Sequence, residues 1–396
     1  MPIAIQNLII LGDSLSDIGI KREAPTGLFA RAAGFMRTNE VGRYSDGKNW
    51  TDFLVEWMGG ESLIREDKKQ TERATAVHRE LSKESLILST NVGGQLPVRY
   101  SNYAEGGAIA ASDWKPKAGA LTYLKSQVAR YVDERRAMGN HYTGDTLHIV
   151  WIGLNDIVTA QRPEGMELGP QAAATHEPVD VPDQSTAGTG ITPLTQEIKR
   201  EINRIADVFG PQHEHFILVD LPAPGVSIRF QEKIADKGEW AAAEDARKVA
   251  RFNELLAALT AHWPPTSWNT PKVTKEKPSF GASEVTPVGG ADPTHVSRVR
   301  MADWMKVVSA DPKAFNLVGL PQSHGPVRYL GAPEPMTDPG LRRALTTSDL
   351  AHPTEAVYEL IGRQIVDTAM AKGYQLGKLD PGSWPGKRPF PTVPGI

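Results

Sequence analysis

Four short motifs that carry chemically useful side chains occur in a fixed order along the 396-residue chain. They are Gly12-Asp13-Ser14-Leu15, Gly106-Gly107, Gly153-Leu154-Asn155-Asp156 and Asp349-Leu350-Ala351-His352. Together they offer a hydroxyl nucleophile, donors for a negatively charged oxygen, and a histidine base with an acid nearby. Attack on an ester carbonyl needs all of these groups at the same moment. The combination, rather than any single motif, therefore predicts ester chemistry.

Ser14 is the candidate nucleophile. It follows an aliphatic run from Ile3 to Leu11 and then Gly12. Such a turn after a strand can expose a hydroxyl and lend its own backbone N–H to an oxyanion. The chain lacks a Gly-x-Ser-x-Gly elbow, and an isolated serine of this kind would be interpreted as a helix cap. The three accompanying motifs favour the catalytic interpretation.

His352 is the candidate base, and Asp349 is the acid that would orient it. A spacing of three residues lets the carboxylate reach Nδ1 while Nε2 faces the serine. The alternative is a helix-entry turn before Pro353. A second stretch, Asp292-Pro293-Thr294-His295, has the same spacing. We expect that stretch to be irregular with no helix after it, so we prefer His352.

Asn155 and Gly107 are the candidates that would complete an oxyanion hole with the backbone of Ser14. Asn155 lies two residues after Gly153, where a side-chain amide can point at the carbonyl oxygen beside the serine. Gly107 would donate a backbone N–H from a loop that must approach closely. Ordinary turn roles are the alternatives for both residues. Asp156 is predicted to hold its loop rather than to react.

One pattern suggests metal binding. His213 and His215 flank Glu214 and could ligate an ion from alternate positions. Apart from Glu214 itself, no carboxylate or thiolate partner lies near them in the sequence, which favours a solvated turn. We therefore expect the chemistry to require neither a metal nor another cofactor.

The composition narrows the range of substrates and partners. The net charge is -3, and acidic and basic residues are interspersed, so no basic face predicts a nucleic acid or an anionic membrane as a partner. A small-molecule or neutral lipid ester fits better. The absence of cysteine excludes disulfides, thiolate metal sites and a cysteine nucleophile. The oligomeric state stays open.

The sequence also predicts no stable membrane insertion. No apolar run is long enough to cross a bilayer. The first residues carry no basic flank, long apolar core or cleavage site, so we expect no signal peptide. The compartment stays open between the cytoplasm and export by another route.

The elements that must position these residues alternate between strands and helices. Aliphatic runs predict buried parallel strands at residues 3–11, 147–152 and 216–220. Helical periodicity occurs around residues 124–132, 198–209, 242–261 and 353–372. The alternation predicts an α/β fold with a parallel sheet covered on both faces. Ligands of such sheets bind beyond the carboxyl ends of the strands, where Ser14 and Asn155 are expected.

We expect a single domain over residues 1–379, followed by a Pro- and Gly-rich tail over residues 380–396. Three segments interrupt the alternation and are predicted to be insertions, near residues 60–94, 162–193 and 263–293. Loops this long in a compact domain tend to be either functional lids or disordered segments. The second begins just after the Asn155 motif and is either a lid or a plain surface loop.

The sequence resembles the GDSL lipase/esterase family of the SGNH hydrolases. The resemblance begins with Gly-Asp-Ser-Leu-Ser-Asp-x-Gly, here Gly12 to Gly19. Residues 42–50 with Asp52-Phe53-Leu54 look like the second loop of the family, and residues 102–108 look like its glycine block. The likeness covers nearly the full length apart from the insertions. Ile20 departs from the polar residue that related chains often carry there.

The resemblance implies a flavodoxin-like, three-layer α/β/α sandwich. It also implies that Ser14 is the nucleophile, with His352 as its base and Asp349 as the orienting acid. The oxyanion hole would comprise the backbone N–H groups of Ser14 and Gly107 and the side chain of Asn155. Large insertions leave the substrate range open, because loops set specificity on this fold.

These observations predict a serine-dependent esterase or lipase that forms an acyl-enzyme on Ser14. One alternative keeps that acyl-enzyme but passes the acyl group from a phospholipid or other ester to an alcohol, as an acyltransferase does. Another alternative is a non-catalytic lipid-binding module with the same fold. The sequence does not determine the acyl length or the alcohol.

Overall fold

The computed structural model describes ten stretches of the chain, which include the predicted site residues except Asp349; residues 349–351 and 292–294 of the two Asp-x-x-His motifs lie outside them. These stretches are residues 2–32, 38–81, 97–111, 122–158, 194–223, 227, 234–235, 238–261, 295–317 and 352–376. The predicted insertions at residues 162–193 and 263–293 and the predicted tail lie outside them.

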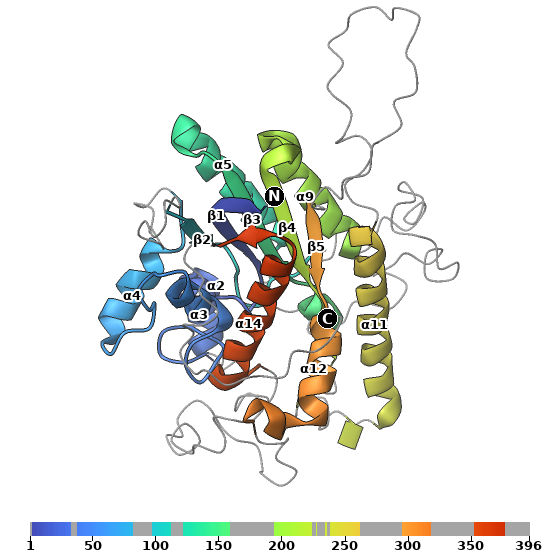
Figure 1. Cartoon of the computed structure of the whole chain (residues 1–396). Coiled ribbons are helices and arrows are strands. Elements are labelled where there is room, and N and C mark those ends of the chain that lie inside the picture. Colours follow the sequence, from blue (N-terminus) through green and yellow to red (C-terminus); the bar gives the residue numbers. More distant parts are fainter. Residues whose placement is uncertain are drawn as a thin grey trace, which may run out of the picture.

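A parallel sheet lies at the centre of the molecule (Figure 1). Its strands are β1 (Ile3–Gly12), β2 (Arg99–Asn102), β3 (Asp145–Trp151), β4 (Glu214–Val219), β5 (Val296–Val299) and β6 (Tyr374–Gln375). The order is β2-β1-β3-β4-β5, with β6 also paired to β1, and every pairing is parallel. Residues Leu8 to Leu11 are buried, as expected of a strand covered on both faces. The predicted α/β fold class is confirmed.

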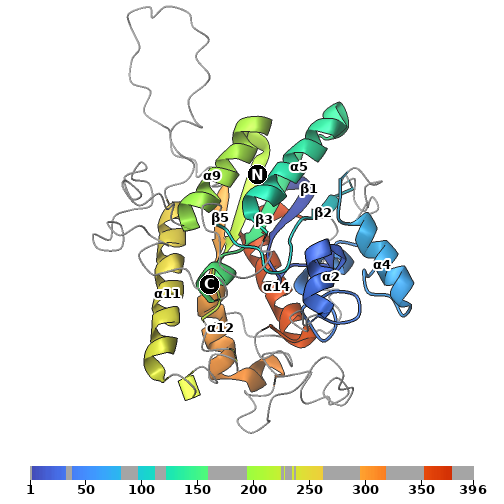
Figure 2. The ribbon, with the colours of Figure 1, turned by 180° about the vertical axis from the view of Figure 1, so that it is seen from behind.

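Helices cover both faces of the sheet. On one face lie α5 (Leu124–Met138) and α9 (Leu194–Phe209), and α11 (Glu239–Ala261) packs beside α9 (Figures 1 and 2). On the opposite face, α14 (Glu355–Ala371) packs against α3 (Trp50–Trp57). The sequence of α9 explains why this helix packs on the sheet. Its apolar residues recur every three or four positions, which places them on one buried stripe along the helix. The layers form a sandwich of helices, sheet and helices.

Shorter elements connect these layers. The α-helices are α1 (Ile20–Glu23), α2 (Pro25–Ala32), α4 (Lys68–Val77), α6 (Leu154–Val158) and α12 (Met301–Ala310), and the 3-10 helices are η1 (Gly139–His141), η2 (Pro211–His213) and η5 (Pro312–Phe315). Helix α4 falls inside the first predicted insertion. The carboxylate of Asp67 caps it by accepting the N–H groups of Lys69 and Gln70. This part of the segment is therefore regular.

None of the described helices combines the length and the apolar character that crossing a bilayer requires.

Candidate active site

The candidate nucleophile, Ser14, lies two residues beyond the end of β1. Its turn is closed by Asp13, whose carboxylate accepts the N–H of Leu15 at 3.0 Å and whose carbonyl accepts the N–H of Ser16 at 3.1 Å. Ser14 is buried, with 8% of its surface exposed. The turn thus holds the hydroxyl at the carboxyl edge of the sheet, where α/β proteins bind ligands.

The candidate base, His352, contacts this hydroxyl directly. Its Nε2 lies 2.8 Å from Oγ of Ser14, although the two residues are 338 positions apart in the chain. His352 precedes α14, which begins at Glu355 after Thr354 in an extended conformation. The helix therefore fixes the position from which the imidazole reaches the serine. Asp349 lies outside the described residues, so its orienting role stays a prediction.

His295, which shares the spacing of the His352 motif, lies at the amino ends of the strands, opposite the edge that carries Ser14. It precedes β5, and its carbonyl accepts the N–H of Phe216 at the start of β4. Its ring stacks on that of His215 with a centroid separation of 5.0 Å. The expectation that no helix follows this histidine is wrong, because β5 leads directly into α12. His295 is excluded as the base for Ser14 because it lies at the amino end of β5, and not because the chain around it is irregular.

Asn155 and the glycine block lie side by side. Asn155 is in the first turn of α6, and its Nδ2 donates to the carbonyl of Ala108 at 3.1 Å. Gly107 has φ of +78°, a left-handed conformation that favours glycine. The structure thus brings the amide of Asn155 to the loop that carries Gly107. Asp156 accepts the N–H groups of Ala110 and Ala111 at 2.9 and 3.1 Å, which is the loop-holding role predicted for it.

Asp17 connects the serine loop to the glycine block, a role that was not predicted from the sequence. Its two carboxylate oxygens accept four backbone N–H groups, from Gly19, Ile20, Lys21 and Gly106. Burial raises the pKa of Asp17 to about 6, and these hydrogen bonds oppose the shift. The only sequence signal was its place in the Ser-Asp-x-Gly part of the first motif. Asp17 fixes the distance between the serine loop and the predicted oxyanion donors.

Asp13 is a second buried carboxyl beside the reacting pair. It is 1% exposed. Burial raises the pKa of Asp13 to about 7, with the Leu15 N–H and the positive charge available on His352 lowering it, and Asp156 and Asp17 raising it. Asp13 thus lies within electrostatic reach of His352 and of two further buried carboxyl groups, those of Asp17 and Asp156.

Gln127 on α5 holds the backbone just ahead of the nucleophile. Its Oε1 accepts the N–H of Gly12 at 2.9 Å, and its Nε2 donates to the carbonyl of Gly12 at 2.7 Å. This amide replaces the hydrogen bonds that a neighbouring strand would make. No motif in the sequence indicated this role, because the partners are 115 residues apart.

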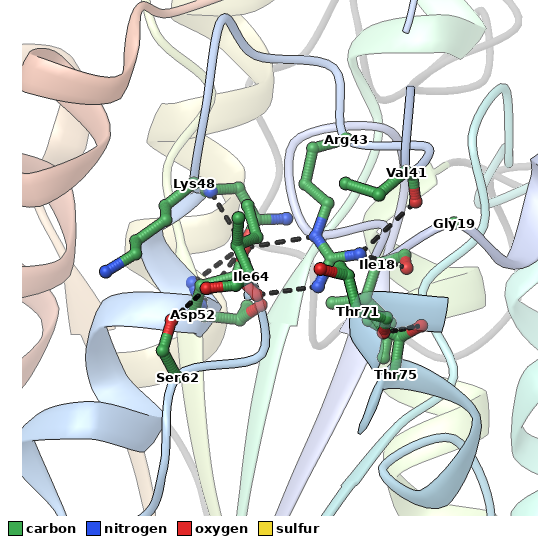
Figure 3. A network of polar contacts seen from close by, with 12 residues as sticks. Ile18, Gly19, Val41, Arg43, Lys48, Asp52, Ser62, Ile64, Thr71 and Thr75 are labelled. Atoms are coloured by element: carbon green, nitrogen blue, oxygen red, sulfur yellow. Dashed lines mark hydrogen bonds and ion pairs between the residues drawn. The ribbon is translucent and has the colours of Figure 1, made fainter. Parts of the chain in front are cut away.

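Arg43 and Asp52 form a fully buried ion pair that supports the loop after Ser14. Nε and Nη2 of Arg43 donate to the two oxygens of Asp52 at 3.1 and 2.7 Å, and both side chains are 0% exposed. Figure 3 shows the guanidinium between this carboxylate and the carbonyls of Ile18 and Val41, to which Nη1 donates at 2.8 and 3.3 Å. Asp52 also accepts the N–H of Asn49, closing the capping box of α3.

The histidines flanking Glu214 differ from the solvated turn that was expected. His215 is 2% exposed and lies in β4, while His213 ends η2 and is more than half exposed. Both rings approach the same oxygen of Asp145, each at 3.2 Å. The interpretation as a solvated turn is therefore wrong for His215. Within the part of the chain that the structure describes, no group of three or more side chains suited to holding a metal was found.

The sheet and its covering helices define an α/β protein that holds a serine–histidine pair at the carboxyl edge of its strands. The model of the GDSL-like Lipase/Acylhydrolase family matches residues 8–365, and the chain belongs to this family. The family places the protein among the hydrolases that act on esters. No curated protein matches the chain significantly.

Proposed function

We propose that this protein is a serine esterase or lipase that cleaves carboxylic esters through an acyl-enzyme on Ser14. The observation that supports this proposal most directly is the 2.8 Å separation between Nε2 of His352 and Oγ of Ser14. A serine hydroxyl is a weak nucleophile at neutral pH unless a base within hydrogen-bond reach takes its proton. The substrate would be an ester of a small molecule or a lipid.

In the first half of the reaction, His352 accepts the proton of Ser14 as Oγ forms a bond to the carbonyl carbon. The carbonyl oxygen becomes an anion, which the N–H groups of Ser14 and Gly107 and the amide of Asn155 would stabilise. When the tetrahedral intermediate collapses, the bond to the alcohol oxygen breaks. The imidazolium of His352 then gives its proton to the departing alkoxide, and the acyl group stays on Oγ.

In the second half, water replaces the alcohol. His352 takes a proton from the water as its oxygen bonds to the acyl carbon, and the same donors hold the oxyanion. When the intermediate collapses, the bond between Oγ and the acyl carbon breaks and the carboxylic acid is released. The imidazolium of His352 gives its proton to Oγ, which restores the hydroxyl of Ser14. Asp349 would hold the Nδ1 proton of His352 and stabilise the imidazolium in both halves.

The test is hydrolysis of chromogenic esters graded by acyl length, with the Ser14→Ala protein measured alongside. We expect the wild-type protein to turn over at least part of the series and the variant to lose nearly all of that activity. Equal rates for the two proteins would refute the assignment of Ser14. A background response over the whole series, with stoichiometric ligand binding, would instead indicate a lipid-binding module.

Product analysis distinguishes hydrolysis from acyl transfer. With an added acceptor alcohol, an esterase releases mainly the free acid, whereas an acyltransferase forms a new ester from the same acyl-enzyme. We expect the free acid to dominate. A dominant new ester that depends on Ser14 would assign the protein to the acyltransferases.

A further inference from the structure

A short loop at residues 44–47 is attached to the entrance of α14, immediately after His352. The hydroxyl of Tyr358 on α14 donates to the carbonyl of Tyr44 at 3.2 Å. The first N–H of the helix, that of Glu355, donates to the carboxylate of Asp46 at 2.5 Å. A carboxylate in this position is favoured by the positive end of the helix dipole. The loop and the helix entrance are therefore held together as one unit.

Tyr44 extends from this loop to both halves of the candidate site. Its ring lies against the imidazole of His352, with a centroid separation of 4.8 Å and an angle of 36° between the planes. The hydroxyl end of the Tyr44 ring lies against Gly106. A Cβ added at Gly106 would be 2.6 Å from the ring atoms Cε2 and Cζ and would overlap the hydroxyl. The absence of a side chain at Gly106 is thus what admits the ring.

We propose that Tyr44 is a positioning residue for ester cleavage, which sets the imidazole of His352 and the Gly106–Gly107 loop at a fixed separation. The inference rests on the proposed function of Ser14 and His352. Gly106 is also held from the side of the nucleophile, because its N–H donates to Asp17 at 2.8 Å. Tyr44 provides the corresponding contact from the side of the base.

Two physical effects make this contact matter for the rate. The imidazole must keep its plane and direction so that Nε2 stays on the serine, and a displacement of about 1 Å can cost on the order of 100-fold in rate. The imidazole also becomes a cation during each half-reaction, and an aromatic face beside a cation stabilises it. Both effects depend on the ring of Tyr44 rather than on its hydroxyl.

The experiment compares Tyr44→Ala, which removes the ring, with Tyr44→Phe, which keeps it. We expect Tyr44→Ala to lower kcat by about 30- to 100-fold with KM changed less than about threefold, and Tyr44→Phe to stay within about threefold of wild type. The rate at which a fluorophosphonate modifies Ser14, followed by mass spectrometry, should fall in parallel. Tyr44→Leu is the substitute should the alanine variant fail to fold, and the same loss is expected from it.

Phe53→Ala is the matched control. Phe53 is a partly buried aromatic residue on the neighbouring helix α3, where it stacks on Trp57 at 5.8 Å. Its loss should lower the melting temperature while kcat stays within about threefold of wild type. A fall in kcat as large as that of Tyr44→Ala would mean that any lost ring disturbs the site, and it would overturn the inference.

A double-mutant cycle tests the contact with the glycine loop. Gly106→Ala should reduce kcat in the wild-type background because its Cβ displaces Tyr44, and it should cost much less in the Tyr44→Ala background. Equal losses in both backgrounds would contradict the proposal. If the wild-type protein is active and Ser14→Ala is inactive, but Tyr44→Ala keeps the wild-type kcat, the positioning role of Tyr44 is wrong while the proposed function stands. If wild type neither turns over esters nor labels at Ser14, both fail.

Discussion

Replacing Gln127 by alanine should lower both the stability of the fold and the rate of ester cleavage. The Gln127 side chain is 5% exposed and binds both the N–H and the carbonyl of Gly12, two residues before Ser14. In the variant the N–H of Gly12 loses its partner. The carbonyl keeps a second donor, the N–H of Glu105 at 3.1 Å. One buried donor is therefore left unsatisfied next to the nucleophile.

The size of the effect follows from these contacts. An unsatisfied buried donor costs about 1 to 3 kcal/mol, and the lost side-chain methylene adds about 0.8 kcal/mol. We expect the free energy of unfolding to fall by about 2 to 4 kcal/mol. Relaxation of the Gly12 peptide would also move the serine turn, and a shift of several tenths of an ångström there should lower kcat by about 10- to 100-fold.

Asn253 provides a matched control. On α11 it makes the same two-way pairing with Leu221, accepting its N–H and donating to its carbonyl, both at 2.9 Å. Leu221 follows β4, which lies two strands from β1 and thus about 10 Å away. Asn253→Ala should lose about 1 to 3 kcal/mol of stability while kcat stays within about threefold.

Urea unfolding monitored by tryptophan fluorescence gives the stabilities, and steady-state hydrolysis of a chromogenic ester gives kcat. A Gln127→Ala protein that is destabilised but turns over at the wild-type rate would show that Gln127 does not position the serine turn. The proposed link between this amide and the rate would then be wrong. It would be refuted equally by an Asn253→Ala protein that loses as much activity as Gln127→Ala.

Three further predictions address the site and its support. Asn155→Ala should lower kcat by about 100-fold with little change in the melting temperature, and a loss below about threefold would exclude its amide from the oxyanion hole. Asp52→Ala leaves the buried Arg43 without its carboxylate and should cost about 3 to 5 kcal/mol in urea unfolding, so a cost below 1 kcal/mol would contradict the support role. Burial raises the pKa of Asp13 from 3.8 to about 7, so between these values the folded protein retains a proton that the unfolded chain has lost. The contribution of Asp13 to the free energy of unfolding is therefore largest at low pH and declines between about pH 4 and pH 7. Asp13→Asn, whose amide oxygen can still accept the N–H of Leu15, should show a shallower decline over that range, and an unchanged slope would argue against the raised pKa.

The long strands and helices could be predicted from the sequence because each carries a continuous aliphatic run or a clear helical period. The runs at residues 3–11, 147–152 and 216–220 correspond to β1, β3 and β4. Strands β2, β5 and β6 have only four, four and two residues, and polar residues such as Arg99 and Ser297 interrupt them. These short strands depend on pairing with neighbours that are distant in sequence, so no local pattern distinguishes them from loops.

In the candidate site, too, residues within local motifs could be predicted from the sequence, whereas residues that act through distant contacts could not. Ser14, Gly107, Asn155 and His352 each lie in a short local motif, which is why the sequence indicated them. Gln127 lies in no such motif, and Tyr44 lies in the stretch 42–50, for which the resemblance gave a loop but no role for any residue. The contacts of both side chains are made across long stretches of chain. His215 shows the reverse error, because the carboxylate that contacts it belongs to Asp145, 70 residues earlier.

The most direct test of the account is the rate at which a fluorophosphonate modifies the wild-type and His352→Ala proteins, followed by intact mass and peptide mapping. The reagent reports activation of a serine without requiring the natural substrate. We expect a single adduct on Ser14 in the wild-type protein, and we expect it to form on the order of 100-fold or more slowly in the variant. Equal rates in the two proteins, or an adduct on another residue, would contradict the claim that His352 activates Ser14.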